Sequence, residues 1–169
     1  MNTATAAQTI EFDVGPTGSL SSYEEDGFTF EQISGTTLFF VVSDASDGNP
    51  RPLLETNAFQ FAATSGETFG LVSLDLAAGN SFDTWQVEGF FAAGGSITQN
   101  VSPTIDDLWS TAMFSGFEGL QRVEVTPLVG GLNEGLRWDN IVVPEPTSAA
   151  LVLLGAGAFG VFRRRRPAR

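Results

Sequence analysis

Residues 84–91, Thr-Trp-Gln-Val-Glu-Gly-Phe-Phe, alternate polar and apolar side chains. Trp85 and Val87 fall on one side of an extended chain, whereas Gln86 and Glu88 fall on the other. A period of two residues is typical of a β-strand with one face in a core and one in solvent. The stretch therefore predicts a strand that covers a hydrophobic core.

The same alternation recurs on both sides of this stretch. Apolar side chains two positions apart occur at Phe28/Phe30, Phe59/Phe61, Val72/Leu74/Leu76 and Val123/Val125. With the glycine- and proline-rich breaks between them, they predict strands over 9–14, 27–33, 37–43, 58–62, 69–76, 84–91, 121–127 and 135–143. Residues 106–114 alone suggest a short helical turn. The resulting fold class is all-β: an antiparallel two-sheet sandwich, jelly-roll-like.

The charge is divided unevenly along the chain of 169 residues, whose net charge is -12. All 20 acidic residues lie at or before Glu145, where only three arginines stand, so this part carries -17; the five remaining arginines give the tail +5. A body of such charge repels phosphate backbones, and we expect no nucleic-acid partner. The absence of cysteine and histidine excludes disulfides, thiolate chemistry and histidine-based triads, leaving oxygen ligands.

The character of the sequence changes at Pro144. Pro144-Glu145-Pro146 is followed by an uncharged run over 149–162 and by Arg163-Arg164-Arg165-Arg166. We expect an extended stretch over 144–147 and one hydrophobic helix over 148–166. As a helix the run of 14 residues spans about 21 Å, and arginines at its end snorkel to lipid headgroups and mark the cytoplasmic side.

This order of Pro-Glu-Pro, hydrophobic run and arginine cluster resembles the PEP-CTERM sorting signal of Gram-negative bacteria. The resemblance covers 144–169 and implies that the tail holds the protein at the inner membrane until an exosortase cuts near Pro144-Glu145-Pro146. The body is then passed to the cell surface or the medium. The alternative is a plain tail anchor.

The first eight residues contain Ala4-Thr5-Ala6, which satisfies the small-residue pattern of a signal-peptide cleavage site. We interpret 1–8 as the remnant of a signal peptide or as a disordered leader. The expected organisation is thus a leader over 1–8, a sandwich domain over 9–143 and a sorting tail over 144–169.

Segments of the body, among them 69–77 and Trp138-Asp139-Asn140, resemble PEP-CTERM sandwich domains and carbohydrate-binding jelly rolls. In such jelly rolls an Asp on the last strand often helps to hold a structural calcium, which implies a site at Asp139. Its candidate partners are Asp13, Glu24, Glu25 and Glu31, since carboxylates suit calcium. The alternative is that these are solvated turn carboxylates.

Three tryptophans suggest a sugar-stacking platform, but Trp85 and Trp138 alternate with polar residues and are expected in the core. Trp109 is the candidate for stacking on a ligand. We therefore expect a non-enzymatic module that binds exopolysaccharide or other envelope components. The alternative is a carbohydrate-active enzyme, which needs two separated carboxylates in a cleft.

Overall fold

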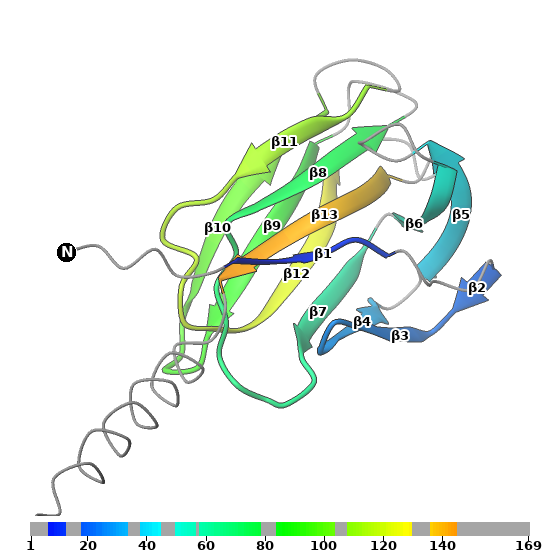
Figure 1. Cartoon of the computed structure of the whole chain (residues 1–169). Coiled ribbons are helices and arrows are strands. Elements are labelled where there is room, and N and C mark those ends of the chain that lie inside the picture. The colour runs from blue at the N-terminus through cyan, green and yellow to red at the C-terminus, as the bar shows by residue number, and fades with distance from the viewer. Residues whose placement is uncertain are drawn as a thin grey trace, which may run out of the picture.

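A computed structural model describes residues 7–12, 18–33, 38–44, 50–56, 58–78, 84–103, 108–129 and 136–144. These residues form two antiparallel sheets that face each other (Figure 1). The expected fold class, an all-β antiparallel two-sheet sandwich, is confirmed.

The first sheet has seven strands in the order β11-β8-β13-β6-β5-β2, with β1 paired to β13. Their bounds are β1 Ala7–Ile10, β2 Gly18–Leu20, β5 Leu38–Asp44, β6 Pro50–Thr56, β8 Ser73–Ala78, β11 Ser110–Met113 and β13 Leu136–Pro144. The last strand is the centre of this sheet, because β13 has β8 on one side and both β6 and β1 on the other. Figure 1 shows β1 lying along β13.

The second sheet has six strands in the order β10-β9-β12-β7-β4-β3. Their bounds are β3 Ser22–Glu25, β4 Phe28–Gln32, β7 Phe59–Ala63, β9 Thr84–Phe91, β10 Ser96–Val101 and β12 Leu120–Val129. Along β9 the side chains alternate between half-buried and buried from Thr84 to Gly89, as residues 84–91 predict.

The core between the sheets is rich in aromatic rings. Phe30 stacks on Phe61 with ring centroids 5.4 Å apart, and Phe28 meets Phe69 edge to face at 5.1 Å. Trp85 and Trp138 are almost completely buried, which confirms that both belong to the core. Edge-to-face and offset pairs are the arrangements that aromatic quadrupoles favour.

All eight predicted strands have a counterpart, but several bounds differ. The segment predicted over 69–76 begins as a strand only at Ser73, and β1 starts at Ala7, inside the expected leader. The expected helical turn over 106–114 is wrong for its described part, because Ser110–Met113 pair with β8 as an edge strand. β2, β3, β6 and β10 have no counterpart among the predicted strands.

The predicted helix over 148–166 lies outside the described residues. Of the predicted extended stretch over 144–147, the structure describes Pro144 alone, and it is the last residue of β13. None of the residues that the structure describes forms a helix long and apolar enough to cross a membrane.

The contact between Phe59 and Trp138 generates a test of the core. Their ring centroids lie 5.3 Å apart and join β7 of one sheet to β13 of the other. Phe59→Ala should lower the free energy of unfolding by about 3–5 kcal/mol, because it leaves a cavity between the sheets. Met113→Ala, at a side chain 62% exposed on an edge strand, is the control and should change it by less than about 0.5 kcal/mol. Urea unfolding of the purified protein measures both, and equal effects would contradict this description of the core.

Candidate functional site

The outer face of the six-stranded sheet carries two rows of outward-pointing side chains. Because the strands pair in register, each row crosses four neighbouring strands and ends on β10. One row, in spatial order, is Glu31, Gln60, Glu124, Glu88 and Thr98. The adjacent row is Thr29, Ala62, Arg122, Phe90 and Ser96; its Ala62–Arg122 neighbours follow from the pairing of Val123 with Phe61.

The short side chain of Ala62 leaves a hollow in the middle of this face. A cavity of about 200 Å³ lies there. Its polar lining comes from β4, β7 and β12 and from the residue that follows β7: Thr29, Glu31, Gln60, Arg122 and Thr64. We call this cavity the sheet-face groove.

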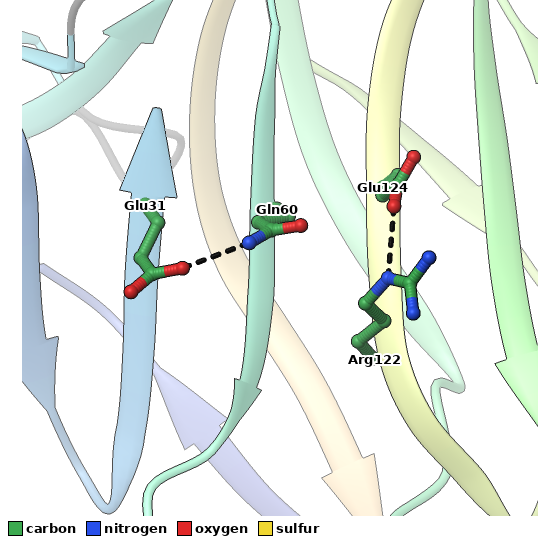
Figure 2. A network of polar contacts seen from close by, with 4 residues as sticks. All are labelled: Glu31, Gln60, Arg122 and Glu124. Carbon is green, nitrogen blue, oxygen red and sulfur yellow. Dashed lines mark hydrogen bonds and ion pairs between the residues drawn. The ribbon is translucent and has the colours of Figure 1, made fainter. Parts of the chain in front are cut away.

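Polar contacts hold the side chains around the sheet-face groove in place. Gln60 donates from Nε2 to Glu31 Oε2 at 2.8 Å, and Arg122 donates from Nε to Glu124 Oε1 at 2.8 Å (Figure 2). The Arg122 guanidinium also lies 3.8 Å from the centroid of the Phe90 ring. A half-exposed ion pair of this kind adds little stability, so its main effect is to fix the direction of two charged groups.

These groups suit a ligand with many hydroxyls. Carboxylates accept hydrogen bonds, a guanidinium donates several in a planar fork, and an amide does both. They stand on strands, which position binding groups more precisely than loops do. The lining of the groove therefore offers both donors and acceptors to a hydroxyl-bearing molecule.

Sequence patterns do not identify this groove. They single out Glu31 only as a calcium ligand, and they give no role to Gln60, Phe90, Arg122 or Glu124. The sequence does hold one signal: the polar residues that alternate with apolar ones in 58–62 and 121–127 must point outward. Among them, Arg122 is one of only three cations before the tail.

Asp139 lies on the other sheet and is completely buried. It stands directly opposite Asp75 of β8, an arrangement in which two carboxylates repel each other. Asn140 donates to both carboxylates: its backbone N–H donates to Asp139 Oδ1 at 2.9 Å and its Nδ2 donates to Asp75 Oδ2 at 3.0 Å. Thr111 donates to the other oxygen of Asp75 at 2.6 Å.

The backbone at Asn140 allows this arrangement. Its φ is 45°, a left-handed conformation that asparagine tolerates better than most residues. The register between β13 and β8 shifts by one residue between Asp139 and Val142, which is a β-bulge. The bulge turns the Asn140 amide toward Asp75.

The proposed calcium partners of Asp139 are not gathered around it in the described part of the chain. Glu25 lies on β3 of the other sheet, where it accepts a hydrogen bond from the Tyr23 hydroxyl at 3.0 Å. Glu24 and Glu31 lie on β3 and β4, and Asp13 falls outside the described residues. No group of three or more acidic side chains within the described ranges fits a metal ion, and calcium takes about 6–8 oxygen ligands. The described residues alone do not make this site, so calcium at Asp139 stays a prediction that depends on Asp13.

Trp109 is half-buried beside the start of β11, on the seven-stranded sheet. The Arg137 guanidinium lies 6.0 Å from its ring centroid. Arg137 stands on β13 opposite Ala77 of β8, so this contact is on the seven-stranded sheet. Ala77 is completely buried. The ring thus belongs to a different sheet from the sheet-face groove. Stacking of Trp109 on a ligand stays a prediction.

Among the sorting residues, Pro144 is half-buried at the end of β13, where it pairs with Ala7. Glu145, Pro146 and Arg163, Arg164, Arg165 and Arg166 lie outside the described residues.

The calcium hypothesis makes a direct prediction for thermal unfolding. With calcium about a hundredfold above its dissociation constant, melting should rise by about 5–10 °C over melting in chelator, because the ion binds only the folded state. Asp13→Asn should remove the difference. Equal melting of the unmodified protein in calcium and in chelator, followed by circular dichroism, would eliminate the hypothesis.

Comparison with solved structures finds similar folds at low sequence identity. An exo-β-agarase matches with a TM-score of 0.55 and 10% identity over 82% of this chain, which spans 25% of the agarase chain. A family 29 carbohydrate-binding module matches with a TM-score of 0.44 and 15% identity, over 81% of this chain and 90% of the module. Another structure of that module, in complex with mannohexaose, gives 0.45 and 12% over 83% and 92%. At these identities the likeness concerns the fold alone.

Comparison at the level of sequence gives one match. No curated protein is significantly similar to the chain. The model of the PEP-CTERM protein-sorting motif matches residues 142–166, which confirms that the C-terminal tail resembles this sorting signal. The chain therefore carries a PEP-CTERM sorting motif, which implies an exported protein that is sorted at a membrane.

Proposed function

We propose that the protein is carried across the inner membrane of a Gram-negative bacterium, held there by the tail over 144–169, and released by an exosortase to the cell surface or the extracellular matrix. The support is the sorting motif over 142–166. The charge agrees with this orientation, since the arginines stay on the cytoplasmic side and the body with its -17 lies outside.

For the body we propose non-catalytic binding of a polysaccharide through the sheet-face groove. The observation that carries this proposal is the set of planar polar side chains around the hollow at Ala62, each fixed by a neighbour. A chain of sugars presents hydroxyls at regular spacing along one direction. A hollow ringed by acceptors and donors from β4, β7 and β12 can meet several of these hydroxyls at once.

The geometry favours binding over hydrolysis. A glycosidase of the usual kind needs one carboxyl group that gives a proton and a second that acts as base or nucleophile. Glu31, which lines the groove, accepts a hydrogen bond from Gln60, and Glu124, the partner of the lining residue Arg122, accepts one from that arginine. Carboxylates held in this way accept hydrogen bonds from hydroxyl groups and are not arranged to donate a proton. Binding is therefore the first candidate, and a carbohydrate-active enzyme is the second.

The groove is tested with neutral polysaccharides in affinity gel electrophoresis. Gln60→Ala should weaken retention by about tenfold or more, because a lost hydrogen bond to a charged partner leaves Glu31 without its donor. Met113→Ala, exposed on the opposite sheet, is the matched control and should leave retention unchanged. If both variants and the unmodified protein are retained equally on every polysaccharide that binds, the groove is not the binding site. Release of reducing sugar would favour the enzyme.

The tail is tested by replacing Pro144, Glu145 and Pro146 with alanine. Insertion depends on the apolar length of the tail and on its flanking charges, so the variant tail should still insert. A peptidase that recognises the three side chains should no longer cut it. Full-length protein should therefore accumulate in the inner membrane of a host that has an exosortase, as measured by mass spectrometry. Replacing Arg163, Arg164, Arg165 and Arg166 should instead weaken retention and orientation. Cleavage of the alanine variant at the normal rate would leave only a plain tail anchor.

A further inference from the structure

The sorting motif begins inside the folded body. Pro144 is the last residue of β13 and pairs with Ala7 of β1, and the preceding Val143 pairs with Gln8. On the other side of the strand, Val72 donates its backbone N–H to the Val142 carbonyl at 2.9 Å. Residues 142–144 therefore have strands or backbone donors on their flanks, and no linker separates the first motif residue from the sheet.

Gly70 fixes the position of the Pro144 ring. A Cβ atom at this glycine would stand 3.1 Å from the Cδ and Cγ atoms of Pro144, closer than nearly all real contacts. Glycine thus lets the segment before β8 approach the proline closely. The first motif residue is held by the tertiary structure and by its strand partner.

This arrangement limits what a peptidase can bind. Peptides are commonly recognised in extended form by main-chain hydrogen bonds along an edge, but the main chain up to Pro144 already lies in the sheet. An enzyme that cuts near the motif therefore cannot bind residues 142–144 as a free strand. On the amino-terminal side it meets a folded surface.

That surface contains a cavity of about 220 Å³ with Pro144 at its border. The buried residues Phe28 and Phe69 line it together with the exposed acidic residues Asp26 and Glu67. Gln8 donates from Nε2 to the Asp26 carbonyl at 2.8 Å, which ties β1 to the turn between β3 and β4. We call this cavity the motif-side pocket.

The chemistry of the motif-side pocket matches a long cationic side chain. Arginine and lysine carry an apolar stem and a charged head: the stem can lie along Phe28 and Phe69 while the head meets Asp26 and Glu67. Two carboxylates and no cation are among the described residues that line it. A hydrogen-bonded pair with a carboxylate is among the stronger polar contacts available to a partner.

We propose that the motif-side pocket is the docking surface of the processing peptidase, which inserts a lysine or arginine there while it reads the motif. This inference rests on the proposed processing of the tail. It adds that the enzyme recognises the folded end of the sandwich together with the linear motif. Its grounds are the two acidic residues beside buried aromatic rings and the contact of the pocket with Pro144, the first residue of the motif.

The test follows cleavage of the full chain over time in a host with an exosortase. Asp26→Asn combined with Glu67→Gln removes both charges and keeps the shape, and asparagine tolerates the φ of 51° at position 26. Cleavage should slow by about tenfold. Asp26→Asn combined with Glu67→Arg should slow it further, because the pocket then repels the incoming cation.

The control removes two exposed carboxylates that do not line the pocket, Glu24→Gln with Glu118→Gln, and should be cut at the normal rate. Melting of each purified variant verifies that the body is folded. Normal cleavage of both pocket variants, while the alanine variant of the motif stays uncut, would overturn the docking surface and leave the sorting proposal intact. Normal cleavage of the alanine variant would refute the sorting proposal itself. Equal slowing in the carboxylate control would show an effect of total charge and would also overturn the pocket.

Discussion

The contact between Phe59 and Trp138 joins the two sheets, and it does so at β13, the strand that pairs with three others. Trp138 lies on β13, the strand that binds β8, β6 and β1 into one sheet, and Phe59 lies on β7 in the interior of the other sheet. Burial of rings of this size dominates the energetics of a core. Once the inward faces of both strands are fixed by this pair, period-two geometry fixes their outward faces too. Gln60 therefore points to solvent because its neighbours Phe59 and Phe61 point to the core.

Period two explains which strands the sequence could predict. Strands with strong alternation of large apolar residues, such as 58–62 and 121–127, are recognisable because one face is buried. β10, Ser96–Val101, and β11, Ser110–Met113, escape recognition because they lie at sheet edges and carry mostly small or polar residues. β6 escapes it because Pro50 and Pro52 argue against a central strand. In the structure β13 pairs with Leu54–Thr56, beyond both prolines, so the part that contains them has β5 as its described neighbour.

The sites are harder to predict than the fold, because they depend on which strands become neighbours. The sorting motif is continuous in sequence and can be recognised there. The sheet-face groove joins residues from β4, β7 and β12, and only the strand order brings Glu31, Gln60 and Arg122 together. For Asp139 the sequence points to the right strand, but the Asn140 bulge and the opposing Asp75 depend on the register between β13 and β8.

The position of β13 also has a consequence for the order of events during export. Its partners β1, β6 and β8 come from much earlier in the chain. In an export that carries the chain across unfolded and amino-terminus first, the seven-stranded sheet therefore lacks its central strand until residue 144 has crossed. Contacts between such distant segments form slowly, since a long loop must close before they give any stability. Four residues, 145–148, separate the end of this strand from the uncharged run over 149–162. In that order of events the body completes this sheet only once the start of the tail has arrived as well.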